Sequence, residues 1–157
     1  MDFFPSLNEL KKKIKNQQNQ IVYTKFSADL DTPVSLMLKL AKNEKNNFLL
    51  ESVTGGEIKG RYSVLGMKPD LIWKCDLKKS KINRNVLKKS NDFFKQQESP
   101  INALKSLIKE SEVKIPDNLP AMSAGLFGYL SYEMMNFVKE VSDDSKKNLG
   151  LPQSILF

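Results

Sequence analysis

A carboxylate, a hydroxyl and a guanidinium come close together in the segment 48–73, FLLESVTGGEIKGRYSVLGMKPDLIW. Glu51 and Ser52 end an apolar stretch typical of a β-strand, and a glycine-containing turn leads back to Arg61 and Ser63 at the start of a second one. Antiparallel strands joined in this way are neighbours, so we expect these polar groups to meet beside apolar side chains. An acceptor for an ammonium and a donor for a carboxylate, next to an apolar wall, are what an apolar amino acid needs as a binding site.

Composition narrows the kind of site that the chain can build. Its 157 residues suffice for one domain with a hydrophobic core, and 40% hydrophobic with 27% charged residues indicate a globular protein. We predict a single domain over 1–157. The absence of histidine excludes imidazole bases and imidazole metal ligands within these residues. The one cysteine, Cys75, permits no intrachain disulfide and indicates a reducing compartment, and we interpret it as a strand residue without a redox role.

The net charge of +7 suggests a nucleic-acid partner at first. Only Arg61 and Arg84 are arginines, however, and the lysines are spread along the chain. Because nucleic-acid sites favour the arginine fork, this pattern predicts a solvated surface instead. No apolar run reaches the ~18 residues of a membrane span, and the N-terminus lacks the residue order of a signal peptide. We therefore predict a cytoplasmic protein that binds neither nucleic acid nor membranes.

Helix and strand patterns alternate along the chain without a repeat. Helical spacing and N-cap residues predict helices over 7–17 and 33–42, the second strongly buried, and another that begins at Ser99-Pro100. Strands are predicted over 21–27, 48–52, 62–65, 71–77 and 123–130, with a short strand and a variable loop in 78–97, a linker over 111–120, a helix or irregular turn after 132 and a strand that starts near 151. Gly125 and Gly128 predict a close approach by another backbone or by a ligand. This order predicts an α+β fold with a mainly antiparallel sheet and flanking helices.

Three sequence blocks resemble one enzyme family in order and spacing. They are ADLDTPVSLMLKL at 28–40, FLLESVTGG with GRYSVLG at 48–66, and GLFGYLSYE at 125–133, followed by LGLP. Together they resemble the N-terminal region of component I of the anthranilate synthases, which are chorismate-utilising enzymes. The resemblance extends over nearly the whole chain.

The resemblance implies that the chain stops before a catalytic domain. In that family the N-terminal region packs on a larger chorismate-binding domain, which carries the catalytic residues and the Mg²⁺ ligands. It follows that 1–157 holds no catalytic residue and no metal ligand, and that this fragment alone is inactive. The complete enzyme would use chorismate as substrate, a glutamine amidotransferase (component II) as the source of ammonia, and L-tryptophan as feedback inhibitor.

The resemblance also assigns an inhibitor site. The family's tryptophan-binding motif matches at Leu50, Glu51 and Ser52, and the TPVS block matches at Pro33 and Val34. Leu50, Pro33 and Val34 would receive the indole, Glu51 would accept from the ammonium, and Ser52 would bond the ligand. Arg61 and Ser63 would reach the carboxylate or hold Glu51.

Simpler interpretations remain open for several of these residues. Leu50 and Val34 could be core residues, Pro33 could serve only to start a helix, and Glu51 with Arg61 could form a structural ion pair. At the level of function, aminodeoxychorismate synthase component I shares the fold and the substrate, and GYLSYE favours it. A stand-alone amino-acid-binding regulatory module and a basic nucleic-acid-binding protein are the alternatives from other classes.

Overall fold

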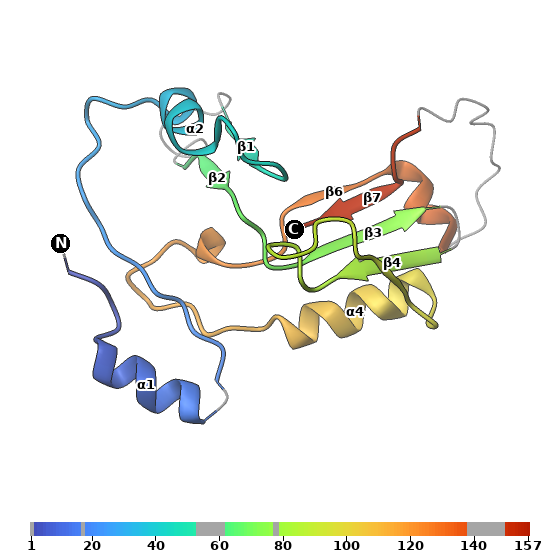
Figure 1. Ribbon diagram of the computed structural model, residues 1–157, viewed down its shortest axis with the longest axis horizontal. Coiled ribbons are helices and arrows are strands. Elements are labelled where there is room, and N and C mark those ends of the chain that lie inside the picture. The colour runs from blue at the N-terminus through green and yellow to red at the C-terminus, as the bar shows by residue number, and fades with distance from the viewer. Residues whose placement is uncertain (1, 17, 53–61, 77–78, 138–149) are drawn as a thin grey trace. The chain divides into compact units, whose positions relative to one another are not determined.

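The computed structural model describes residues 2–16, 18–52, 62–76, 79–137 and 150–157 (Figure 1). The helices in these residues are α1 (Leu7–Lys15), α2 (Pro33–Ala41) and α4 (Pro100–Glu110), with two 3-10 helices, η1 (Ala121–Ser123) and η2 (Tyr132–Phe137). The strands are β1 (Phe48–Leu50), β2 (Val64–Gly66), β3 (Ile72–Asp76), β4 (Lys79–Asn83), β5 (Phe94–Lys95), β6 (Gly128–Leu130) and β7 (Ser154–Leu156). The predicted α+β class with antiparallel pairing is confirmed.

The strands form two sheets. β1 and β2 make a two-stranded antiparallel sheet, and the other five have the order β5-β4-β3-β7-β6. β7, the last strand, lies between β3 and β6 and is antiparallel to both. Its register places Leu156 between Trp73 and Gly128, so one row of residues crosses three strands that are distant in sequence.

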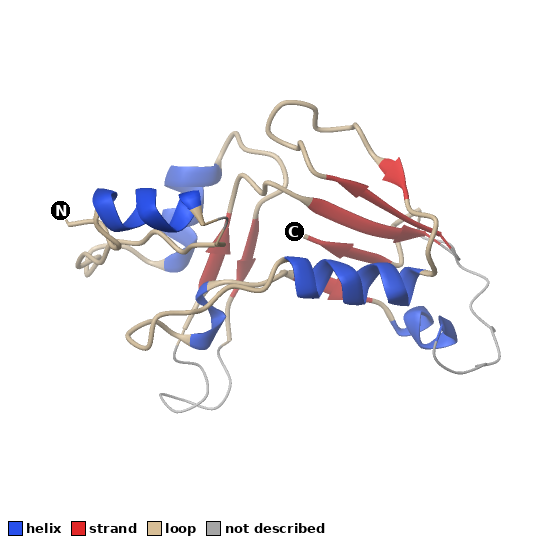
Figure 2. Ribbon diagram, turned by 90° about the horizontal axis from the view of Figure 1, so that it is seen from below, coloured by secondary structure: helices blue, strands red, loops and turns tan. Residues whose placement is uncertain are grey.

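α4 lies along the five-stranded sheet and supplies part of its core (Figures 1 and 2). Ser99 caps the helix by accepting a hydrogen bond from the backbone N–H of Asn102, and Pro100 occupies the first helical position. The buried residues of α4 are Pro100, Ala103, Leu104 and Leu107, which is the spacing of one helical face. On the sheet, Trp73 and Cys75 are fully buried, and Trp73 Nε1 donates a hydrogen bond of 2.8 Å to Gln96 Oε1.

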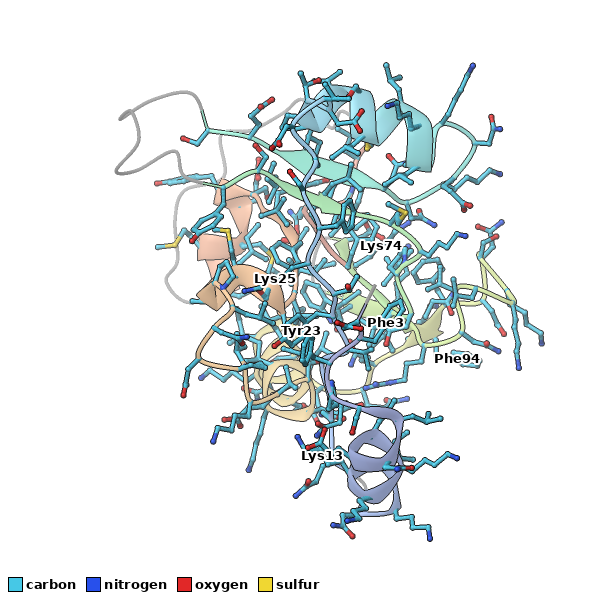
Figure 3. All side chains as sticks on the ribbon, turned by 90° about the vertical axis from the view of Figure 1, so that its left-hand side faces the viewer. Phe3, Lys13, Tyr23, Lys25, Lys74 and Phe94 are labelled. Carbon is cyan, nitrogen blue, oxygen red and sulfur yellow. The ribbon has the colours of Figure 1, made fainter. Side chains whose placement is uncertain are left out.

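The strand predicted over 21–27 is absent, and that prediction is wrong. Within it only Tyr23 pairs with another backbone segment, through two hydrogen bonds of 2.8 and 2.9 Å to Phe4. Tyr23 and Lys25, on this extended segment (Figure 3), bond instead to Asn118, the lysine through a contact of 2.8 Å to the Asn118 carbonyl. The residue types favour a strand, but side chains rather than a backbone ladder hold the segment in place.

Two further predictions need correction. α2 is not strongly buried, because Ala41 is its only fully buried residue and its packing partners are the two short strands β1 and β2. The strand predicted over 123–130 is limited to β6. The close approach by another backbone is confirmed at Gly128, where an added Cβ would lie 2.9 Å from the Ile155 carbonyl carbon. At Gly125 no protein atom lies within 4 Å of an added Cβ, so approach by a ligand stays a prediction there.

Backbone contacts divide the chain into two compact units. The first contains Met1–Phe26, Trp73–Lys81 and Lys95–Leu156, and the second contains Ser27–Ile72, Ile82–Phe94 and Phe157. Among the described residues no helix has the length and apolar character needed to cross a membrane.

Candidate functional site

The predicted site residues that the structure describes all lie in the second unit, on α2 and β1 or next to β1 and β2. β1 and β2 pair with the register Phe48↔Gly66, Leu49↔Leu65 and Leu50↔Val64. Glu51 and Ser52 come directly after the last pair, and Ser63 comes directly before it. α2, which begins with Pro33 and Val34, packs against both strands. Arg61 lies outside the described residues, so its predicted role stays a prediction.

The Phe48 ring packs at the end of the β1–β2 pair that is opposite to Glu51, Ser52 and Ser63. Phe48 lies against Gly66, where an added Cβ would be 2.9 Å from Phe48 Cδ1 and nearer still to Cε1 and Cζ. The same ring stacks on Phe157 with a centroid separation of 6.2 Å. Because only glycine leaves room for the ring, this pair of residues fixes the register that sets Leu50 opposite Val64.

Polar contacts define where α2 begins and ends. The Thr32 hydroxyl accepts from the Ser35 N–H at 3.1 Å, and the Ser35 hydroxyl accepts from the Thr32 N–H at 2.9 Å, which forms a reciprocal cap around Pro33 and Val34. At the other end, Asn47 Nδ2 donates to the carbonyls of Ala41 at 3.1 Å and Glu44 at 2.7 Å.

Asp31 adds charge to the first turn of α2. Its carboxylate pairs with the Lys39 ammonium and lies 3.0 Å from the Ser35 hydroxyl. These two hydrogen bonds, the one from Lys39 first, hold the pKa of the Asp31 carboxyl below its usual value. Asp31 is therefore charged at neutral pH.

The exposed fractions of Leu50 and Val34 distinguish a core role from a ligand-facing role for these two residues. Leu50 is 47% exposed and Val34 is 51% exposed, so neither is a core residue of the described structure. Pro33 does start a helix, as its simpler interpretation predicts. Glu51, Ser52 and Ser63 are exposed. The arrangement thus offers apolar surface on α2 and β1 with polar groups at the strand ends, which suits a ligand with an apolar body and charged ends.

A separate cavity of about 810 Å³ lies in the first unit, and no predicted site residue lines it. Its apolar walls include Leu104 and Ile108 of α4, Val113 and Ile115 of the following segment, and Leu130 of β6. Gly125, where the sequence leaves approach by a ligand open, is among its lining residues, whereas the segment 111–120 is interpreted from sequence only as a linker. The apolar Val113 and Ile115 within that polar segment were the available signal.

The described residues offer little for redox or metal chemistry. No group of three or more potential metal ligands is present among them. Burial first, and the neighbouring Asp76 charge second, raise the pKa of the Cys75 thiol to about 11. Cys75 is therefore a neutral thiol at physiological pH, as its assignment to a strand without a redox role requires.

Comparison with known proteins shows to which protein family the chain belongs. A Cereibacter sphaeroides protein named anthranilate synthase component 1 is 52% identical to this chain over 142 residues, which is 90% of the chain. The chain is a homologue of anthranilate synthase component 1. The component 1 of Acetivibrio thermocellus is 30% identical over 152 residues, 96% of the chain, and the probable component 1 of Schizosaccharomyces pombe is 29% identical over 160 residues, 100% of the chain. No family model matches the chain.

The anthranilate synthase component 1 relatives are much longer than this chain. The match covers 28%, 30% and 29% of the length of the three proteins in that order. The resemblance drawn from the three sequence blocks is confirmed, and the chain aligns with only a part of each of these relatives.

Proposed function

We propose that the chain is the N-terminal regulatory and structural part of an anthranilate synthase component I. The observation that carries this proposal is the match over 90% of the chain to a relative of that name. The complete enzyme converts chorismate and ammonia to anthranilate and pyruvate in tryptophan biosynthesis. A glutamine amidotransferase, component II, supplies the ammonia, and the name "component 1" of the relatives supports a second component.

The remaining parts of the proposal concern what lies outside these residues. Mg²⁺ and the catalytic residues belong to the catalytic domain of the complete enzyme, so the isolated chain makes no anthranilate. The purified chain, supplied with ammonia, chorismate and Mg²⁺, is expected to give no anthranilate fluorescence, and fluorescence above a protein-free blank would contradict this. The cytoplasm is the proposed location, which the single buried cysteine supports.

The second unit forms part of the tryptophan feedback site in this proposal. Leu50, Pro33 and Val34 receive the indole, and the half-exposed side chains of Leu50 and Val34 support this role. Glu51 accepts from the ammonium. Ser52 bonds the ligand, and Arg61 and Ser63 serve the carboxylate.

A chimera tests the proposal with a complete catalytic domain. The matched segment of the Cereibacter sphaeroides protein is replaced by this chain, and anthranilate formation from ammonia and chorismate is measured against tryptophan concentration. Ser52→Phe is expected to raise the half-inhibitory tryptophan concentration more than about tenfold, because the ring fills space that the ligand needs. Turnover without tryptophan should change little.

The matched control is Ser90→Phe, which places the same ring on an exposed turn outside α2, β1 and β2. It is expected to leave the inhibition curve unchanged. An inhibition curve that Ser52→Phe leaves in place would contradict the assignment of Ser52.

A further inference from the structure

Four side chains around the first turn of α2 form a connected set, which we call the Asp31 frame: Asp31, Thr32, Ser35 and Lys39. The Ser35 hydroxyl lies 3.0 Å from both the Asp31 carboxylate and the Thr32 carbonyl, and it accepts from the Thr32 N–H. The Lys39 ammonium, one turn further along the helix, pairs with the same Asp31 oxygen. The frame therefore joins the residue before the helix to its first and second turns.

Pro33 and Val34 lie inside this frame in the sequence. Thr32 and Ser35 flank them and bond to each other in both directions, so the backbone between them is held at both sides. The turn that leads into the frame is also fixed, since the Asp31 N–H donates to the Ala28 carbonyl at 2.9 Å. None of the four frame residues is one of the proposed ligand contacts, so any effect of the frame on a ligand acts through Pro33 and Val34.

Apolar packing by itself holds α2 only weakly in position. Only Ala41, at its C-terminal end, is fully buried, and the partners of the helix are two strands of three residues each. At the opposite end the Asp31 side chain is 23% exposed, so water competes only partly for its hydrogen bonds. The position of the first turn consequently depends on polar contacts more than it would in a buried helix.

We infer that Asp31 is a positioning residue for the proposed tryptophan site, holding Pro33 and Val34 in place through Ser35 and Lys39. This inference rests on the proposed function. It assigns no contact between Asp31 and the ligand. Loss of the Asp31 charge is expected to weaken tryptophan inhibition and to leave catalysis without tryptophan unaffected.

Asp31→Asn in the chimera tests the inference, because the amide has the shape of the carboxylate but carries no charge for Lys39. The half-inhibitory tryptophan concentration is expected to rise about two- to fivefold, the range of a surface ion pair. kcat and KM for chorismate in the absence of tryptophan should stay the same, whereas a general loss of structure would lower turnover as well. Lys39→Arg preserves the cation and is expected to preserve normal inhibition.

The matched control is Asp76→Asn in the first unit. It breaks another lysine–aspartate pair, in which Lys81 Nζ lies 2.6 Å from Asp76 Oδ2. Tryptophan inhibition of this variant should equal that of the unmutated chimera. A double-mutant cycle with Asp31→Asn and Lys39→Met should show coupling, and strictly additive effects would overturn the inference.

Hydrogen exchange on the 157-residue chain supplies a readout that needs no activity. The amides of Ser35 and Leu36, which donate to Thr32, should exchange faster in Asp31→Asn and at the normal rate in Asp76→Asn. Unchanged exchange in Asp31→Asn would overturn the inference.

The two proposals fail in different ways. If tryptophan does not inhibit the unmutated chimera, the feedback site is refuted, and the inference falls with it. If the unmutated chimera is inhibited and Asp31→Asn has the same half-inhibitory concentration, only the positioning role is refuted.

Discussion

Gly128→Ala should destabilise the five-stranded sheet because β6 has no room for a side chain at this position. An added Cβ would lie 2.9 Å from the Ile155 carbonyl carbon and 3.1 Å from Leu156 Cα, with the carbonyl oxygen closer still. Carbon atoms pack best at about 3.5–4.0 Å, so β6 would have to move away from β7 by roughly 1 Å. Losing one or two interstrand hydrogen bonds at about 1 kcal/mol each, together with strain of about 1–2 kcal/mol, gives a loss of about 2–4 kcal/mol.

Urea unfolding followed by tryptophan fluorescence measures this loss at the affected strands. Trp73 is the only tryptophan, is fully buried, and shares a row with Leu156 and Gly128 across β3, β7 and β6. For a slope of about 2 kcal/mol per molar urea, the expected loss lowers the unfolding midpoint by about 1–2 M.

Gly125→Ala is a closely matched control. The φ angles of Gly125 and Gly128 are +152° and +156°, so alanine meets the same backbone strain at both positions. At Gly125, however, an added Cβ has nothing within 4 Å. The control should therefore lose only the strain contribution of about 1–2 kcal/mol. If Gly128→Ala loses no more than Gly125→Ala, the close approach of Ile155 does not restrict this position, and the reasoning is refuted.

Two further predictions concern Cys75 and Asn47. At pH 8, native Cys75 should react with 5,5′-dithiobis(2-nitrobenzoic acid) about 100-fold more slowly than the urea-unfolded chain, because its pKa is raised from 9.0 to about 11; equal rates would contradict its burial. Since the folded-state pKa is the higher one, the thiol's contribution to stability is complete below pH 9 and is lost as the pH rises towards 11. Asn47→Ala removes the side-chain bonds to Ala41, the last residue of α2, and to Glu44 in the turn that follows. It should lower local stability by about 1–2 kcal/mol, measured as faster exchange of the α2 amides with unchanged exchange in α4.

The starts of the helices were predictable because their signals are local. Ser6 and Glu9 form the expected capping box, with the Ser6 N–H 3.0 Å from Glu9 Oε2. Pro33 and Pro100 each occupy the first turn after a capping residue. In each case the side chain that marks the boundary bonds to a backbone N–H three residues away, so no tertiary contact is needed to interpret it.

Features that depend on distant segments were predicted less well. The residues of 21–27 favour a strand, yet whether they pair is decided by the neighbouring backbone, and they meet the side chain of Asn118 instead. Gly125 and Gly128 are equivalent in sequence pattern, and only the position of β7 distinguishes them. The depth of burial of α2 was overestimated for the same reason, since its apolar composition does not reveal that its partner is a two-stranded sheet.

The candidate site depends partly on local sequence signals and partly on contacts between distant segments. Residue types and spacing supplied Glu51 and Ser52 as candidates, and the family resemblance added Leu50. The pairing of β1 with β2 places Ser63 beside the same strand end. That α2 would pack on these two strands followed from no local pattern. The exposure of Leu50 and Val34, which favours a ligand-facing role over a core role, required the folded structure.

The described part of this site is too small to bind tryptophan well by itself. Covering the exposed halves of Leu50 and Val34 would contribute about 1–2 kcal/mol together, and a contact between the ligand ammonium and the exposed Glu51 carboxylate about 1 kcal/mol at most. Association costs about 4 kcal/mol or more before any contact is made, so these gains do not reach even millimolar affinity. Calorimetry on the isolated chain should therefore detect no tryptophan binding at micromolar concentrations, whereas tight binding would favour a stand-alone amino-acid-binding module. Under the proposed function, feedback inhibition is therefore a property of the complete enzyme, to which the second unit contributes one wall of the pocket.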